Sequence, residues 1–184
     1  MQLDNIVKMH QNTASQIRSF VLPFTVLVVI PLLVIVGTKG FRFGWGLGLP
    51  YDALVVCIGF ITVMAGLYLL IATIMLFMKV GKGTLAPWAP TKKLVVIGPY
   101  RYVRNPMISG VLIALLGESI VFGSIAILSW FILCFVTNHV YFILSEEPGL
   151  VKRFGDEYLR YRNNVPRWIP RLSPWKNNSS DEEG

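Results

Sequence analysis

A short polar segment with the residue types of a ligand site interrupts an otherwise apolar chain. The segment, GPYRYVRNPMISG at Gly98–Gly110, holds two arginines, two tyrosines, an asparagine and two prolines. Asn105 followed by Pro106 is typical of a helix start, because asparagine caps helices and proline suits the first helical position. Helix caps and basic membrane anchors explain part of this pattern. They leave the tyrosines and Gly110 unexplained.

A second polar feature, the pair Glu146-Glu147, ends the last apolar run of the chain. Charged carboxylates near the hydrocarbon core are energetically unfavourable unless they pair with cations or bind a ligand. The pair can be neutralised by Arg153 or Arg160, or it can bind a ligand. If the preceding apolar runs form an antiparallel hairpin, the pair meets the polar segment at one membrane face. Backbone donors at a helix start, aromatic rings and carboxylates then suit a small zwitterionic ligand.

The elements that position these residues are predicted to cross a membrane. Hydrophobic residues make up 54% of the 184 residues, and the mean hydropathy is +0.58. About 20 apolar residues in helix cross a hydrocarbon core about 30 Å thick. Uncharged runs lie at Phe20–Thr38, Ala53–Met78, Met107–Gly117 and Ser119–Ser145. We expect an all-α, polytopic membrane bundle with four to five transmembrane helices.

The boundaries of the later runs leave the number of spans open. Glu118 alone separates the third run from the fourth, which indicates a tight helical hairpin. A break near Gly123-Ser124 would raise the number to five. Leu150–Arg162 follows as a C-terminal amphipathic helix suited to the cytoplasmic membrane surface. The sequence shows no signal peptide pattern, so we expect the first span to be retained.

The basic residues predict the orientation of the bundle. Of 17 Lys and Arg, six lie between residues 79 and 104 and seven between 152 and 176. Two spans separate these clusters, so both fall on one side, which the positive-inside rule makes cytoplasmic, with both termini inside. The net charge of +7 also suits anionic lipid headgroups. No recognition element for nucleic acid accompanies the charge.

Cysteine and histidine do not indicate a metal site. Cys57 and Cys134 lie within apolar runs and are interpreted as buried hydrophobic residues without a disulfide. His10 and His139 are far apart and have no carboxylate at ligand spacing.

The order of the polar motifs resembles that of the isoprenylcysteine carboxyl methyltransferase family, which is related to the phospholipid N-methyltransferases. The family's box is Arg-His-Pro-x-Tyr-x-Gly. Arg104, Pro106 and Gly110 match it, whereas Asn105 replaces the histidine and Ile108 replaces the tyrosine. The family's tail pattern matches at Glu146-Glu147, Leu150, Phe154-Gly155, Glu157-Tyr158, Tyr161 and Val165-Pro166. The resemblance covers about residues 85–171.

The resemblance implies S-adenosylmethionine as the methyl donor and a lipophilic prenylcysteine carboxylate as the acceptor. The implied cofactor positions are Lys92, Lys93, Leu94, Val95, Tyr100, Asn105, Pro106, Met107, Ile108 and Glu146. Composition predicts an amphipathic lead-in at 1–19, two spans at 20–78 and a disordered tail at 172–184, and the resemblance makes the remainder, 79–171, a methyltransferase core. The core holds the inner loop, the helical hairpin and a segment covering the cofactor.

One departure bears on the acceptor. Carboxyl-methylating relatives have an arginine four residues before the glutamate pair, and Phe142 stands there in this chain. This departure favours one alternative, a phospholipid N-methyltransferase. Two others also remain: a sterol-reductase-like enzyme using NADPH, since those membrane enzymes have a related tail architecture, and a non-catalytic membrane protein whose polar residues are only caps and anchors. A lipophilic acceptor is expected to enter the site laterally from the bilayer. Residues 79–98 and 150–162 are expected to cover the donor from the cytoplasmic side.

Overall fold

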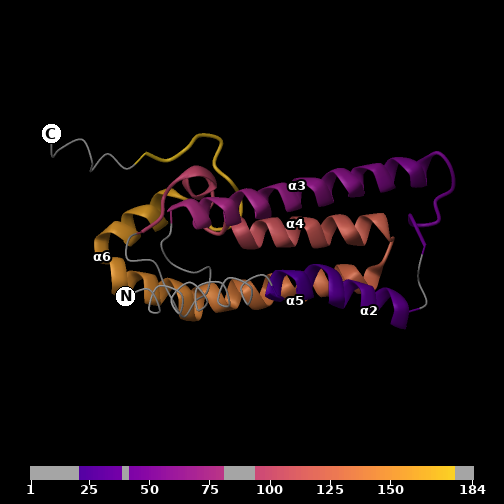
Figure 1. The fold of residues 1–184 in the computed structure, drawn as a ribbon, viewed down its shortest axis with the longest axis horizontal. Helices are drawn as coiled ribbons and strands as arrows, with labels where there is room; N and C mark the ends of the chain where they lie inside the picture. The colour runs from indigo at the N-terminus through magenta and orange to yellow at the C-terminus, as the bar shows by residue number, and fades with distance from the viewer. Residues whose placement is uncertain (1–20, 39–41, 81–93, 177–184) are drawn as a thin grey trace, which may run out of the picture.

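The computed structural model describes residues 21–38, 42–80 and 94–176, and within them every regular element is a helix (Figure 1). The first helix, Val21–Gly37, includes the π-helical turn η1 (Thr25–Val29) and α2 (Ile30–Gly37). The others are α3 (Tyr51–Val80), the 3-10 turn η2 (Gly98–Arg101), α4 (Pro106–Val121), α5 (Ile125–Tyr141), the π-helical turn η3 (Phe142–Glu146) and α6 (Glu147–Asn164). The expected all-α fold is confirmed for these residues. The lead-in expected at 1–19 lies outside them.

Within the described residues, two helices are long and apolar enough to cross a membrane. They are Tyr51–Leu76 and the continuous helix Ile125–Asn164, and Val21–Gly37 and Pro106–Val121 are shorter apolar helices. Large apolar side chains cover the outer faces of the two long helices. Among them are Leu54, Ile61, Met64, Leu133 and Leu144, which are 56–73% exposed. A surface this apolar suits contact with lipid.

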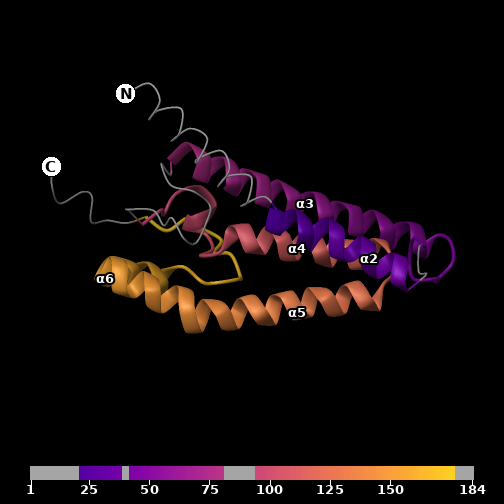
Figure 2. The same cartoon turned by 60° about the horizontal axis from the view of Figure 1, so that its bottom comes forward.

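The helix α4 lies between α3 and α5 in both views of the fold (Figures 1 and 2). Its buried residues include Leu112, Ala114 and Leu115, which pack with Leu70 and Ile74 of α3. The core of the bundle therefore forms around the helix that begins at the polar segment. This packing fixes the start of α4 relative to its neighbours.

Two pairs of glycines bring α3 and α4 together. Gly66 faces Gly110, and Gly59 faces Gly117, with the same spacing of seven residues in each antiparallel helix. A Cβ atom at Gly110 would lie 2.7 Å from the backbone nitrogen of Leu70 and 2.8 Å from the carbonyl oxygen of Gly66. Small residues allow such close approach of membrane helices. Gly110, which the motif alone did not explain, thus has a packing role.

Replacing Gly110 with alanine is expected to destabilise the protein by about 1–3 kcal/mol, because the methyl group would overlap the backbone of α3. The thermal unfolding midpoint in detergent measures this loss. Gly37→Ala is the matched control, since no atom lies within 4 Å of a Cβ at that position. Equal midpoints for the two variants would contradict the close crossing of α3 and α4.

The hairpin between α4 and α5 turns later than the sequence predicted. Glu118 lies inside α4, so the expected division at Glu118 is wrong. The chain turns instead at Gly123, whose φ of 54° is in the left-handed region that favours glycine, and the Ser124 side chain caps α5. The break expected near Gly123-Ser124 is therefore present, but it is the hairpin turn itself and adds no fifth helix.

A hydrogen bond joins the first helix to α5. In η1 the N–H of Ile30 bonds to the carbonyl of Thr25, five residues back. Pro31 has no N–H with which to continue this pattern to Val26. The indole Nε1 of Trp130 in α5 donates to that open Val26 carbonyl at 3.2 Å. The contact holds the first helix against α5.

The helix α5 continues through η3 into α6 and bends there (Figure 2). In η3 the N–H of Glu147 bonds to the carbonyl of Phe142, and Pro148 has no N–H to extend the ladder. A second kink lies at Gly155, with φ 53°. Beyond the first bend, α6 packs Tyr158 and Tyr161 against Val165 in a small buried cluster. The bend places the glutamate pair at the end of the bundle where α4 begins.

Candidate functional site

The segment after α6 crosses the polar segment and is bound to it through the backbone. We call residues 165–176 the strap. Its hydrogen bonds with the polar segment run from Arg104 N to Pro166 O (2.9 Å), from Arg171 N to Tyr102 O (3.0 Å), from Trp175 N to Arg101 O (2.9 Å) and from Arg101 Nε to Trp175 O (2.8 Å). These contacts continue past the expected boundary at residue 171, so the tail predicted over 172–184 was begun too early. Residues 177–184 lie outside the described part.

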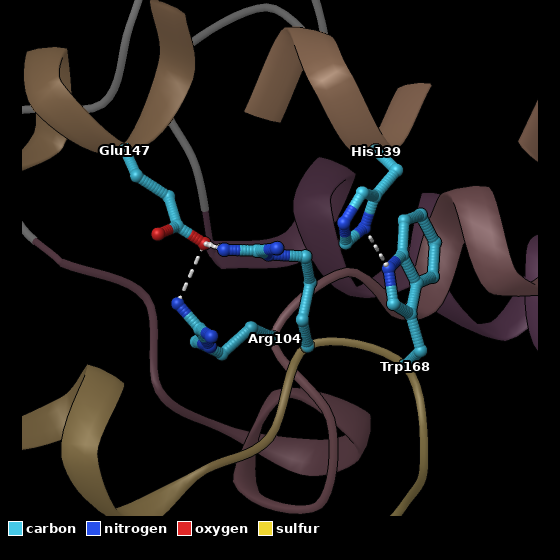
Figure 3. A network of polar contacts seen from close by, with 5 residues as sticks. Arg104, His139, Glu147 and Trp168 are labelled. Carbon is cyan, nitrogen blue, oxygen red and sulfur yellow. Dashed lines mark hydrogen bonds and ion pairs between the residues drawn. The ribbon is translucent and has the colours of Figure 1, made fainter. Parts of the chain in front are cut away.

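Glu147 binds two arginines at the junction of α4, α6 and the strap. Arg104 donates from Nη1 to Glu147 Oε1 at 2.7 Å, and Arg167 donates to the same oxygen from Nη2 at 2.7 Å and from Nε at 2.8 Å. Figure 3 shows the Arg104 and Glu147 side chains pointing toward each other. Glu147 is 8% exposed. The ion pair ties the start of α6 to the polar segment and to the strap.

One alternative that the sequence left open was pairing of the glutamates with Arg153 or Arg160, and for Glu147 that alternative is wrong. Arg153 and Arg160 lie on the exposed side of α6, where the Arg153 guanidinium stands 5.7 Å from the centre of the Phe154 ring. The helix therefore turns these two arginines away from the glutamate that they follow in sequence. The partners come from other elements of the fold.

Glu146 points in a different direction from Glu147, because successive residues are about 100° apart around a helix. It is half-buried and has no hydrogen bond or ion pair with any other residue that the structure describes. Its charge contributes to the raised pKa of the Tyr100 phenol. Two of the expected cofactor positions, Tyr100 and Glu146, therefore lie at the same end of the fold, where α6 packs against the polar segment.

Tyr100 is held as a neutral phenol. Burial raises its pKa well above the usual range, and nearby Tyr161 and Glu146 add to the effect. The Tyr161 hydroxyl donates a hydrogen bond of 2.7 Å to the Tyr100 carbonyl oxygen. The backbone of Tyr100 is therefore held by α6, and its side chain is an uncharged phenol.

The start of α4 is where the sequence predicted it, at Asn105 and Pro106. The Asn105 side chain makes no capping hydrogen bond, however, so that part of the prediction is wrong. Asn105 has φ −122° and ψ 59°, and only its carbonyl joins the helix, by accepting from the Ser109 N–H at 2.9 Å. The amide of Asn105 is not used for capping.

The remaining expected cofactor residues differ in their surroundings. Pro106 is fully buried, and Met107 and Ile108 pack against the core of the bundle. Leu94 packs against the cluster of Tyr158, Tyr161 and Val165, and Val95 is half-buried. Lys92 and Lys93 lie outside the described residues. Residues 106–108 thus use their side chains for packing, which leaves their backbone groups for any ligand contact.

Sequence reasoning missed the role of the strap. Trp168 Nε1 donates to His139 Nδ1 of α5 at 3.0 Å (Figure 3), and its ring packs against Phe135 and Phe142. Phe142 is 4% exposed. The tryptophan in this proline-rich segment was the sequence feature that could have indicated that the segment packs against the helices. No group of three metal-ligating side chains occurs among the described residues.

Residues 53–157 match the family described as phospholipid methyltransferase. The match covers more than half of the chain, so the protein belongs to this family, and its class is that of the membrane methyltransferases. The chain is also similar to protein-S-isoprenylcysteine O-methyltransferase of Schizosaccharomyces pombe, with 39% identity over 79 residues. That match covers 43% of this chain and 34% of the relative, so it spans about a third of the relative's length. The resemblance found in the motifs is confirmed.

Proposed function

We propose that this protein is an S-adenosylmethionine-dependent membrane methyltransferase acting on the carboxylate of a lipophilic, prenylcysteine-like acceptor. The observation that carries the proposal is that two arginines engage Glu147, whereas the adjacent Glu146 is left without a partner among the described residues. A half-buried carboxylate without a hydrogen-bond partner among the described residues suits the ammonium group of the donor. The name of the yeast relative supports the acceptor.

The side chains fit the donor in type. Glu146 can bind the ammonium, the Asn105 amide can donate and accept hydrogen bonds, and an aromatic residue such as Tyr100 is of the type that attracts a cation. S-adenosylmethionine supplies an activated methyl group, and an ionised acceptor carboxylate needs no general base. The task left to the protein is to align the reactants and exclude water. The bent helix and the strap suit that task because they fix Glu147 at the start of α6.

Aminolipid N-methylation is the second candidate, and one observation favours it. Phe142 occupies the position of the arginine found in carboxyl-methylating relatives, and it is buried against Trp168. An amine acceptor does not need that cation. Membership of a methyltransferase family supports neither an NADPH-dependent reductase nor a non-catalytic protein.

Glu146→Gln is expected to weaken binding of S-adenosylhomocysteine by about 1.5–3 kcal/mol, roughly 10- to 150-fold, because a charged hydrogen bond is lost. Isothermal titration in detergent measures the dissociation constant. Glu157→Gln, at an exposed position of α6, is the control. An unchanged constant in folded Glu146→Gln would remove this residue from the donor site. Methyl transfer to farnesylcysteine or to phosphatidylethanolamine then separates the two acceptors.

We further propose that four helices span the membrane, with the polar segment and strap at the cytoplasmic face beside anionic headgroups. With 16 residues, α4 is about 24 Å long and spans only a thinned bilayer. Three spans separate Leu47 from Leu172, and both side chains are exposed. Cysteines at these positions, after replacement of Cys57 and Cys134, are expected to label from opposite sides. Labelling from one side would require an even number of spans between them.

A further inference from the structure

The strap contains a short loop whose two ends are both bound to the polar segment. The carbonyl of Pro166 accepts from the Arg104 N–H, and the Arg171 N–H donates to the carbonyl of Tyr102, two positions away from Arg104. Figure 2 shows the strap running back from α6 and turning beside the start of α4. Because its ends are attached so close together, the chain between them, residues 167–170, projects from the polar segment as a loop.

The side chains of this loop face different surroundings. Arg167, the one charged residue among residues 165–170, is ion-paired and 16% exposed. Trp168 packs on α5 and donates its indole N–H to His139. Ile169, the next residue, is 80% exposed, and Pro170 is exposed as well. The protein therefore encloses the charged and aromatic side chains of the loop and leaves its two aliphatic ones outside.

The contacts of Trp168 show how far the loop reaches along the bundle. Its ring centre lies 5.2 Å from that of Phe135 and 5.7 Å from that of Phe142. At a rise of 1.5 Å per residue, these two positions are about 16 and 6 Å along the helix from Glu146. Exposed apolar side chains occupy the same stretch of α5 and η3, namely Val136, Val140 and Ile143. Ile169 thus lies at a level where the outer face of the bundle suits lipid.

The charges of the strap and the neighbouring end of α6 fit the boundary of a bilayer. Residues 158–176 hold five basic residues and no Asp or Glu. An apolar tip with basic flanks is typical of segments that insert into a leaflet and meet anionic headgroups.

The backbone of the loop limits how deep it can lie. Pro166 and Pro170 have no N–H, so two donors that would need partners away from water are absent. The N–H groups of residues 167–169 have no backbone partner among the described residues. We therefore expect the loop at the edge of the hydrocarbon core, where water and headgroups still reach these groups while the Ile169 side chain extends inward.

We propose that the loop at residues 167–170 is a membrane anchor, in which Ile169 inserts among the acyl chains of the leaflet on the side of the polar segment. The insertion holds the strap, and with it the start of α4, at a fixed depth in the bilayer. This anchor is separate from the spans of the bundle, and it does not depend on which acceptor the protein methylates. Leu172 lies past the second attachment of the loop and stays at the water side.

The test places the fluorophore NBD on Ile169→Cys in the full chain, after replacement of Cys57 and Cys134, and reconstitutes the protein in vesicles of phosphatidylcholine and phosphatidylserine. Leu172→Cys is the matched control, because it is an exposed aliphatic position of the same strap. A nitroxide on the lipid acyl chain is expected to quench the probe at Ile169→Cys several-fold more than the probe at Leu172→Cys. Aqueous iodide is expected to show the reverse order.

Equal quenching of the two probes by iodide would overturn the inference, because the loop would then face water. Protection of Ile169→Cys from both quenchers that grows with the protein-to-lipid ratio would also overturn it, in favour of contact with a second copy of the chain. An unfolding midpoint equal to that of the cysteine-free parent shows that labelling at this exposed position leaves the fold intact.

A measurement without a label excludes an effect of the fluorophore itself. Hydrogen exchange of the amides of residues 167–169 in the same vesicles is expected to be several-fold faster in Ile169→Gln than in wild-type protein, and unchanged in Leu172→Gln. Equal exchange in Ile169→Gln and wild-type protein would overturn the anchor. Neither measurement involves methyl transfer, so a failure of the anchor leaves the proposed function standing.

Discussion

Replacing Glu147 with alanine is expected to destabilise the folded protein by about 3–5 kcal/mol. The substitution leaves the guanidinium groups of Arg104 and Arg167 facing each other in a nearly buried position without their shared anion. It also removes the ion pair between the strap and α6, whereas the hydrogen bonds between the strap and the polar segment remain. Chemical unfolding in detergent measures the change. Glu157→Ala, on the exposed side of the same helix, is expected to change stability by less than about 0.5 kcal/mol.

A triple replacement tests whether charge or shape causes this loss. Arg104→Met, Glu147→Leu and Arg167→Leu together remove all three charges and keep apolar volume. Because no unpaired charge remains, the triple variant is expected to be more stable than Glu147→Ala. If the triple variant is less stable than Glu147→Ala, the unpaired charge left by Glu147→Ala is not the main cause of its instability. The cluster would then stabilise the fold through the geometry of its contacts.

Features set by neighbours in sequence were predictable. The start of α4 follows from Asn105 and Pro106, since the preference of proline for the first helical turn is a property of the residue itself. The end of α4 was misplaced because a single glutamate was taken as a boundary. Glutamate is a good helix former, and the chain turns only where Gly123 adopts a positive φ.

Features set by distant contacts were not predictable. Glu147 pairs with residues 43 and 20 positions away, whereas sequence reasoning looked to arginines within the same helix. Three of the four hydrogen bonds of the strap to the polar segment join backbone atoms, which carry no side-chain signature. The role of Gly110 likewise depends on Gly66 in another helix. Lys92 and Lys93 remain predictions.

The arrangement of polar and apolar surfaces leads to a prediction about the acceptor. The glutamate pair and the polar segment lie at one end of the bundle, with α6 and the strap packed there (Figure 1). The outer faces of α3 and α5 are apolar along their length. A water-soluble donor is expected to arrive from the cytoplasm, and a prenyl chain is expected to arrive sideways between helices. Residues 150–162 of α6 are then expected to cover the donor, and most of the other expected cover, residues 79–98, lies outside the described part of the chain.

Catalytic efficiency is therefore expected to climb steeply with the length of the acceptor's chain. Each methylene transferred into an apolar environment adds up to about 0.8 kcal/mol, so the five carbons between geranyl and farnesyl add at most about 4 kcal/mol. Geranyl-, farnesyl- and geranylgeranylcysteine should be compared at fixed detergent partitioning, because partitioning alone raises the local concentration of longer chains. A cleft open to water would bind mainly the polar end of the acceptor. The efficiency would then be independent of chain length, and that result would exclude lateral access in favour of a soluble substrate.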